Sequence, residues 1–232
     1  MLDFSQFSVL TFDCYGTLID WESGLVPVLR GLLIDHAQPA ADGKLLEVFG
    51  ELEAQAEQGD YKPYRQILEE VAAAFAARSG REASALEKQS LSKSLPNWPA
   101  FGDTVESLQR LQGRFKLGVI SNVDDDLFAA TAPKLGVKFD YFISAQQVKS
   151  YKPSTANFIA AIERINEPPQ KILHVAQSLY HDIAPARSLG LQTVWVNRRG
   201  GQKGWGATPP ASARPTLEVP SLKALADLAT PA

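Results

Sequence analysis

The sequence contains little sulfur, no excess of basic residues and no long apolar run. Cys14 is the single cysteine among 232 residues, which excludes an internal disulfide framework and suits a reducing compartment. The net charge of −3 gives no basic surface for nucleic acid. No stretch approaches the roughly 18 apolar residues of a membrane span, and the N-terminus lacks the pattern of a signal peptide. We therefore expect a cytoplasmic protein that binds neither nucleic acid nor membrane.

What the chain does contain is enough apolar sequence for a sizeable core, since 45% of its residues are hydrophobic and 21% are charged. Short apolar runs that end in polar or small residues are predicted to be strands, at residues 8–13, 116–122, 141–144, 172–177 and 193–197, with a last short strand near Leu217. Helical stretches separate the later runs. Apolar strands that alternate with helices predict an α/β fold, a Rossmann-like parallel sheet covered on both faces.

One part of the chain has no strand pattern. Four stretches between about residues 24 and 95 have helical spacing instead. The segment "LPNWPAFGD", residues 95–103, contains two prolines and a glycine, as expected for a hinge that returns to the sheet. We predict a catalytic core of residues 1–17 and 98–232, interrupted by an α-helical cap domain of residues 18–97.

Polar clusters follow four of the predicted strands or their connections. In an open parallel sheet, ligands bind beyond the carboxyl ends of the strands. The clusters are centred on Asp13, Ser121, Lys152 and Asp182. An acid, a hydroxyl, an ammonium and a second acid at one edge would form a nucleophilic site for an anionic substrate. Each residue alone has an ordinary reading as a helix cap or loop residue, so the prediction depends on their order and spacing together.

These clusters resemble, over nearly the whole chain, the four motifs of the haloacid dehalogenase superfamily. The matching segments are "DCYGT", "ISN", "YKP" and "AQSLYHD". The resemblance implies that Asp13 is the nucleophile, with Thr17 and Ser121 as hydroxyls that orient it or the substrate. It also implies that Lys152 is the cation, that Asp182 is the acid of the fourth motif, and that the helical insertion covers the site.

Two positions distinguish branches of this superfamily. Its phosphatases carry a second Asp two residues after the nucleophile, where this chain has Tyr15, whose unperturbed pKa near 10 suits proton donation poorly. Where those phosphatases have an Asp that reaches magnesium, this chain has Gln177, a weaker ligand for a hard cation. The "DCYGT" form resembles the 2-haloacid dehalogenases, whose departing halide needs no proton.

That resemblance implies a hydrolase of the 2-haloacid dehalogenase type. Such an enzyme cleaves the carbon–halogen bond of a small 2-haloalkanoic acid, an anionic substrate, through an aspartyl ester to give a 2-hydroxy acid and halide. No cofactor and no metal ion are then expected. Relatives of this type are often dimers, so the resemblance also favours a homodimer.

The chain departs from that branch at several positions. The tyrosine that relatives carry six residues after the lysine is Phe158 here, and an asparagine of their fourth motif is Leu179. Their cap also supplies an arginine for the halide, which has no evident counterpart. Candidate substrate-binding residues are Cys14, Tyr15, Asn122 and Ser178 in the motifs, with Trp21, Tyr61 and Arg65 in the cap. Lys62, Tyr64 and Trp98 are further cap candidates.

Two other functions stay open on the sequence alone. A magnesium-dependent phosphatase of the same superfamily could bind the ion through Asp13, the carbonyl of residue 15 and Asp182. A non-catalytic binding protein could use the same scaffold, because a fold does not fix a function. The joint presence of the motif residues argues against the second alternative.

Overall fold

A single parallel sheet forms the centre of the computed structural model, which describes residues 2–33 and 41–231. The strands are β1 (Val9–Phe12), β2 (Lys116–Ser121), β3 (Tyr141–Ser144), β4 (Ile172–Ala176), β5 (Gln192–Val196) and β6 (Leu217–Val219). Within the described residues their order is β3-β2-β1-β4-β5-β6, and every neighbouring pair is parallel. The predicted fold class is confirmed, and each predicted strand is present.

The central position of β1 explains its continuous apolar sequence. All four of its residues are buried, because β2 lies on one side, β4 on the other, and helices cover both faces. The strand order reverses direction beside β1, so the segment after Phe12 emerges at the crevice where ligands bind in open α/β sheets. Asp13 is the first residue of that segment.

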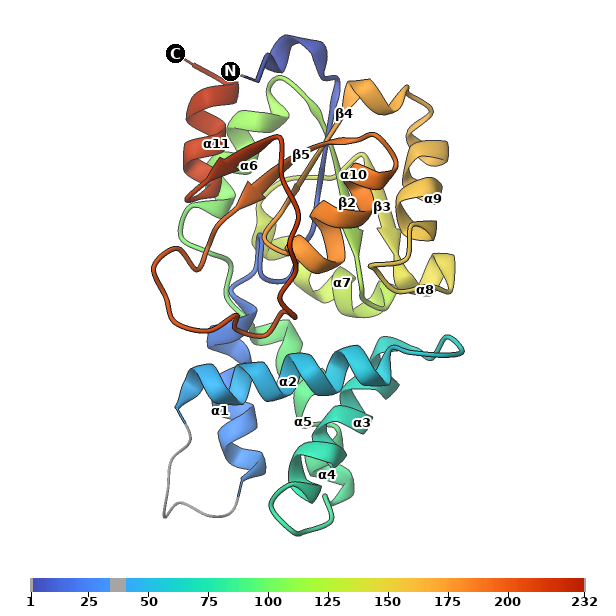
Figure 1. Cartoon of the computed structure of the whole chain (residues 1–232), viewed down its shortest axis with the longest axis vertical. Helices are drawn as coiled ribbons and strands as arrows, with labels where there is room; N and C mark the ends of the chain where they lie inside the picture. The colour runs from blue at the N-terminus through green and yellow to red at the C-terminus, as the bar shows by residue number, and fades with distance from the viewer. Residues whose placement is uncertain (1, 34–40, 232) are drawn as a thin grey trace.

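Helices pack on both faces of the sheet (Figure 1). On one face lie α6 (Thr104–Gln112) and α11 (Leu222–Ala229), which contact each other. On the other lie α9 (Ala156–Ile165) and α10 (Ala184–Ser188). Alternate residues of β1 face opposite sides, with Val9 in the cluster of α9 and α10 and Leu10 in the larger cluster. Two shorter helices, α7 (Asp125–Thr131) and α8 (Ala145–Val148), lie near the carboxyl ends of the strands.

The predicted helical insertion follows β1 and precedes α6. It contains α1 (Trp21–Leu32), α2 (Asp42–Ala56), α3 (Tyr64–Ala77), α4 (Ala85–Lys88) and α5 (Ser90–Ser94). Helix α1 begins earlier than expected, because Asp20 accepts a hydrogen bond from the Ser23 backbone and caps it. The expected continuation of this helix to residue 37 lies partly outside the described residues.

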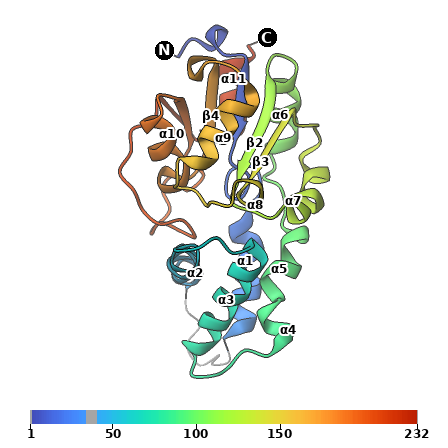
Figure 2. The ribbon, with the colours of Figure 1, turned by 90° about the vertical axis from the view of Figure 1, so that its right-hand side faces the viewer.

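The insertion lies beyond the carboxyl ends of the strands, and Figure 2 shows α2 end-on beneath the core. Its two connections to the core run side by side, since Ile19 bridges to Ala100 and the Phe101 backbone donates to Leu18. We propose that the cap extends between these crossings, from residue 18 to 97.

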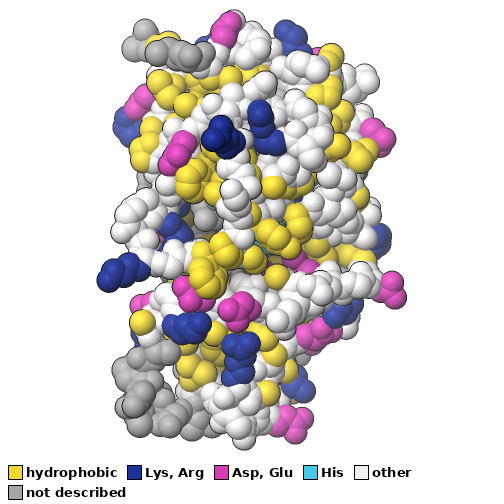
Figure 3. All heavy atoms as spheres, viewed as in Figure 1, with side chains coloured by type: hydrophobic (Ala, Val, Ile, Leu, Met, Phe, Trp, Pro, Cys, Tyr) yellow, Lys and Arg dark blue, Asp and Glu magenta, His cyan; other side chains and the backbone are white. Residues whose placement is uncertain are grey.

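A loop of the core also reaches the cap. Residues 197–216 connect β5 to β6, and Gly50 of α2 lies so close to this loop that a Cβ atom there would be 2.5 Å from the Ala207 carbonyl oxygen. Hydrophobic side chains gather along the seam between the two parts in Figure 3. None of the described helices combines the length and the apolar character needed to cross a membrane.

Candidate active site

Lys152 lies at the centre of the residues that the four motifs bring together. Its ammonium group donates hydrogen bonds to Asp13 Oδ1 at 2.9 Å, to Asp182 Oδ1 at 2.7 Å and to the Ile120 carbonyl oxygen at 2.9 Å. Since an ammonium group has three donors, all of them are used. The side chain is only 2% exposed, so this cation is buried and fully engaged by the core.

The loop after β1 holds Asp13 in place. Its backbone N–H donates to the Val175 carbonyl oxygen of β4, which continues the sheet by one residue. The Thr17 hydroxyl donates to Asp13 Oδ2 at 2.6 Å and in turn accepts from the Gln177 backbone at 2.9 Å. Gly16 has φ of 94°, a value that few other residues adopt, and lets the chain turn back toward the carboxylate.

Asp182 lies in the short helical segment Leu179–Ile183, which follows β4. The Ser178 hydroxyl caps this segment by accepting from the His181 backbone at 2.7 Å. Besides Lys152, Asp182 Oδ1 contacts His174 Nε2 at 3.0 Å, while Asp182 Oδ2 is buried without a hydrogen-bond partner in the described structure. One oxygen of Asp182 is therefore fixed and the other is free to meet a ligand or water.

Burial and charge act differently on the three groups. Burial raises the pKa of Asp13 and the charge of Asp182 adds to this, against the opposing effects of Lys152 and Thr17. Burial also acts against ionisation of Asp182, but Lys152 and His174 outweigh it, so the pKa of Asp182 is lowered. Burial disfavours the charge of Lys152, yet the two carboxylates raise its pKa above the usual value. Lys152 stays charged and Asp182 stays ionised near neutral pH.

A small cavity of about 30 Å³ opens onto Asp13. The core contributes Asp13, Tyr15, Ser121, Asn122, Lys152 and Asp182 to its lining, and the segment after β4 contributes Ser178 and His181. The cap contributes Trp21, Glu53, Glu57 and Tyr64. The cavity is thus closed by side chains of both parts, and acidic groups are present on both of its walls.

Comparison with known proteins agrees with this arrangement. The model of the haloacid dehalogenase-like hydrolase family matches residues 7–190. The chain belongs to the haloacid dehalogenase-like hydrolases. It is 28% identical over 197 residues to (S)-2-haloacid dehalogenase 4A of Burkholderia cepacia, covering 82% of each chain. It is also 26% identical over 210 residues to the 5-amino-6-(5-phospho-D-ribitylamino)uracil phosphatase of Escherichia coli (strain K12), covering 84% of this chain and 86% of that one.

A solved structure described as a dehalogenase with an intermediate complex has the same fold. The superposition covers 100% of both chains with a TM-score of 0.81, at 24% sequence identity. At this identity the likeness shows the fold alone. The predicted membership in the superfamily and the predicted hydrolase class are confirmed.

Not every predicted site residue of this haloacid dehalogenase-like hydrolase lines the cavity. Thr17 reaches it only through Asp13. Cys14 is fully buried, and burial raises the pKa of its thiol. Tyr61 stacks on Tyr151 with ring centroids 5.5 Å apart. Arg65 forms a 2.5 Å ion pair with Asp126 at the surface. Arg65, the cap cation among the candidate substrate-binding residues, therefore lies at the surface and does not line the cavity.

Phe158 and Leu179, the two departures from the dehalogenase motifs, do not line the cavity around Asp13. Phe158 is buried and meets the His174 ring edge-on, with centroids 5.1 Å apart. Leu179 lies outside the cavity around Asp13, at the rim of another surface pocket. Neither side chain replaces the polar group that relatives carry there.

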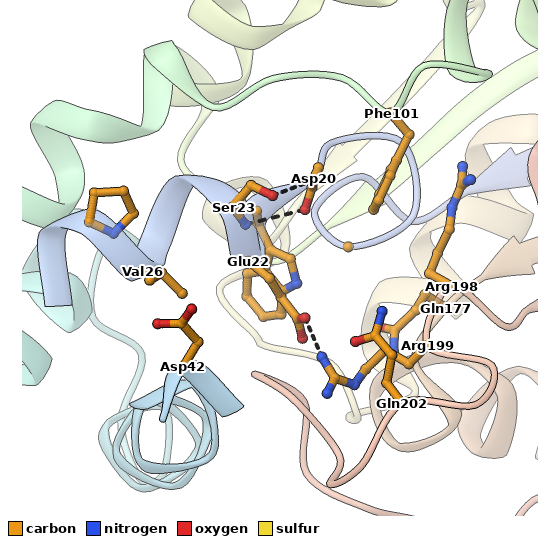
Figure 4. Close-up of a pocket in the computed structure, with 13 residues that line it drawn as sticks. Asp20, Glu22, Ser23, Val26, Asp42, Phe101, Gln177, Arg198, Arg199 and Gln202 are labelled. Atoms are coloured by element: carbon orange, nitrogen blue, oxygen red, sulfur yellow. Dashed lines mark hydrogen bonds and ion pairs between the residues drawn. The ribbon is translucent and has the colours of Figure 1, made fainter. Parts of the chain in front are cut away.

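A larger cavity of about 470 Å³ lies beside the hinge and contains none of the three central residues (Figure 4). Arg198, Arg199, Glu22 and Asp20 line it, and Arg199 pairs with Glu22. Gln177 also lines it, with its side-chain oxygen 3.3 Å from the Thr208 hydroxyl. This second cavity lies behind the loop of the nucleophile and does not expose Asp13.

The placement of Gln177 bears on the magnesium alternative. Gln177 stands where the phosphatases of the superfamily have an Asp, and it lines the hinge cavity and not the cavity of Asp13. Asp13 Oδ1 and Asp182 Oδ1 each accept from Lys152, which competes with a cation for the same oxygens. Among the described residues, no group of three or more His, Cys, Asp or Glu side chains is arranged to hold a metal ion. The residues present do not fit a magnesium site.

The sequence reasoning did not identify Glu53 and Glu57 as site residues. Helix α2 buries Leu45, Leu46 and Phe49 on the same side as Glu53. An acid at a core-facing position of an amphipathic helix is unusual and is the signal that could have revealed it. His181 also lines the cavity, and its Nε2 atom is buried without a partner in the described structure.

Proposed function

We propose that this hydrolase cleaves the carbon–halogen bond of a small 2-haloalkanoic acid and releases a 2-hydroxy acid and halide. The observation that carries the proposal is the buried Asp13, held by Lys152 and Thr17 at the edge of the cavity. The relatives named (S)-2-haloacid dehalogenase support the substrate class.

The residue two positions after the nucleophile supports displacement at carbon over phosphoryl transfer. The Tyr15 hydroxyl lies 2.9 Å from the Thr131 hydroxyl, and burial raises the pKa of Tyr15 well above its usual value. It is therefore a poor acid for protonating a leaving oxygen near neutral pH. A halide leaves as a stable anion and needs no such acid.

In the first step, an oxygen of Asp13 attacks C2 of the substrate from the side opposite the halogen. The new oxygen–carbon bond forms as the carbon–halogen bond breaks, and the halide leaves with the bonding electrons. Lys152 favours the ionised form of Asp13 and remains as the balancing charge. The Ser121 hydroxyl, which has no partner in the described structure, is available to orient the substrate carboxylate.

In the second step, water attacks the carbonyl carbon of the aspartyl ester and not the substrate carbon. The unpartnered Asp182 Oδ2 is placed to accept the proton of that water, because the lowered pKa of Asp182 keeps it ionised. The hydroxy acid then leaves with a proton and Asp13 is restored. The route inverts the configuration at C2.

The cavity of about 30 Å³ is smaller than a haloacid, so substrate access requires the cap and core to separate and then close again. Closure excludes bulk water during the displacement. The homodimer that the family resemblance favours stays a prediction.

Single turnover in heavy-oxygen water tests this mechanism. We expect the label in the Asp13 carboxylate and not in the first hydroxy acid formed. Asp13→Asn should reduce chloride release from 2-chloropropionate by about 10⁴-fold or more. Label that enters the first hydroxy acid directly would show that water is the nucleophile.

A second assay separates the proposal from the phosphatase alternative. Chloride release from 2-chloropropionate should continue in EDTA. Phosphate release from p-nitrophenyl phosphate that depends on magnesium, without chloride release, would assign the protein to the phosphatases.

A further inference from the structure

The cap wall of the cavity carries two carboxyl groups that face the catalytic residues. Glu53 lies in α2, and Glu57 follows one turn later at its C-terminal end. Both line the same cavity as Asp13 and Asp182. Glu53 is 4% exposed, and Glu57 is partly buried. This wall is where a haloacid would meet the cap.

Neutral groups, and not cations, hold these two carboxyls. The Tyr64 hydroxyl of α3 donates to Glu53 Oε1 at 2.5 Å, and the Asn122 amide donates to Glu57 Oε1 at 3.3 Å. Among the described residues that line the cavity, Lys152 is the only cation, and its donors are already used by Asp13, Asp182 and Ile120. The cap carboxyls thus share a buried space with the acids Asp13 and Asp182 and have no charge partner of their own.

The charge of the cavity depends on whether these carboxyls hold protons. If Glu53 and Glu57 were both ionised, the cavity would contain four carboxylates against one ammonium and would repel a haloacid. Burial raises the pKa of Glu53 to about 7. Burial, together with the charge of Glu53, raises the pKa of Glu57 well above its usual value. The other titratable groups around the pair are Tyr64 from the cap and Tyr15, Tyr151, Lys152, Asp13, Asp182 and His181 from the core.

A protonated carboxyl is a hydrogen-bond donor and carries no charge. Apolar sites can keep a carboxylic acid neutral at pH 7 so that it donates to an anion. Two further buried atoms without partners, Ser121 Oγ and His181 Nε2, belong to residues that line the same cavity. His181 is neutral near pH 7, because burial lowers its pKa to about 4. The cavity therefore offers polar atoms that only a ligand or water can satisfy.

We propose that the Glu53–Glu57 pair is the anion-binding group of the cap: it shares a proton and donates a hydrogen bond to the anionic end of the substrate. This inference rests on the proposed function for the identity of that anion. The cap then contacts the anion without a cation, because a protonated carboxyl donates a hydrogen bond and carries no charge. Substrate binding then requires the protonated pair and takes up a proton wherever the free pair has lost it.

Binding of propionate, a haloacid analogue that cannot react, tests the proposal without turnover. Calorimetric titration at pH 6 to 10, in buffers of different ionisation enthalpy, gives both the Kd and the number of protons taken up. We expect the Kd to rise about tenfold per pH unit once the pair ionises, with uptake that approaches one proton. Propionamide, which is isosteric and neutral, should bind without proton uptake.

The variant Glu53→Gln/Glu57→Gln carries amides that donate hydrogen bonds and do not titrate. Its Kd for propionate should change less than about threefold over the same pH range, with no proton uptake. Glu51→Gln is the matched control, since Glu51 is an exposed residue of the same helix and should behave as the wild type. The wild-type measurements decide the question even if the double variant does not fold.

The proposal is overturned if propionate binds without proton uptake at every pH, or if propionamide binds more tightly than propionate at pH 7. The first result would mean that the protonation of the pair is not linked to anion binding, and the second that an ionised pair selects a donor-bearing ligand. No detectable binding of propionate also overturns it. If propionate binds with proton uptake but 2-chloropropionate releases no chloride, the proposed function fails and the anion-binding role of the pair stands.

Discussion

The two walls of the cavity around Asp13 contain the same kind of group in opposite states. On the core wall, Asp182 is fully buried and its pKa is lowered, because Lys152 and His174 outweigh the effect of burial. On the cap wall, Glu53 is nearly as buried, and burial raises its pKa to about 7, because the hydrogen bond from the neutral Tyr64 hydroxyl opposes the effect of burial only in part. Burial penalises the charge in both cases, and the partner decides the outcome.

This difference matches a division of labour in the proposed mechanism. The core wall needs ionised carboxylates, since Asp13 attacks carbon and Asp182 accepts a proton, and it contains Lys152, whose charge favours the ionised form of both. The cap wall only has to bind an anion, for which a neutral donor is sufficient. In this mechanism, the core carboxylates react with the substrate only when the cap brings its protonated acids against the same cavity.

Removal of the core cation should have the largest effect. In Lys152→Met, two buried carboxylates lose their shared partner, and we expect a loss of about 3–5 kcal/mol in the free energy of unfolding. Chloride release should also fall, toward the level of Asp13→Asn, because Asp13 then tends to be protonated. Urea denaturation and a chloride assay measure the two effects. Lys171→Met is the control, since Lys171 is exposed at the other end of β4 and should leave both nearly unchanged.

One result with Lys152→Met would contradict this prediction. A folded Lys152→Met protein with wild-type stability would mean that the core carboxylates do not depend on the cation, and the contrast between the walls would disappear.

Glu53 should give a smaller effect that depends on pH. Its folded pKa of about 7 lies above the unfolded value near 4.3, so its stabilising contribution is complete below pH 4 and is lost as the pH rises through 7. Between pH 5 and 8 the wild type should therefore lose about 2–3 kcal/mol more stability than Glu53→Gln, whose amide does not titrate. Urea denaturation of both proteins at the two pH values measures this difference. Parallel pH dependence in the two proteins would place the titration of Glu53 near its ordinary value.

The residues of the core wall could be predicted from the sequence, because they lie at the ends of strands or in the loops that follow them. Buried parallel strands have continuous apolar sequences, so the ends of β1, β2 and β4 could be located in the sequence. Because these strands are parallel neighbours, their ends lie at one edge of the sheet. The position of Lys152 came from its motif. The hydrogen bonds that Lys152 donates to both acids follow from this placement.

The cap wall could not be predicted in the same way. The pattern of α2 shows that Glu53 lies on its apolar face with Phe49, but it does not show which surface that face meets. The packing of α2 against the core depends on distant contacts, such as the approach of Gly50 to Ala207. Tyr64 and Arg65 illustrate the same limit, because adjacent residues of one helix point in directions about 100° apart. One of them lines the cavity and the other lies at the surface.

Arg65 should have the smallest effect, although it is one of the candidate substrate-binding residues of the cap. Its ion pair with Asp126 joins side chains that are 42% and 69% exposed, and such surface pairs contribute about 0–1 kcal/mol. We expect Arg65→Gln to change stability by less than about 0.5 kcal/mol and the KM for 2-chloropropionate by less than about twofold. Steady-state kinetics at low and high salt measure the change. A rise in KM of tenfold or more would mean that Arg65 turns into the cavity when substrate binds, and the cap wall would then bind its anion through a cation, as the core wall holds its acids.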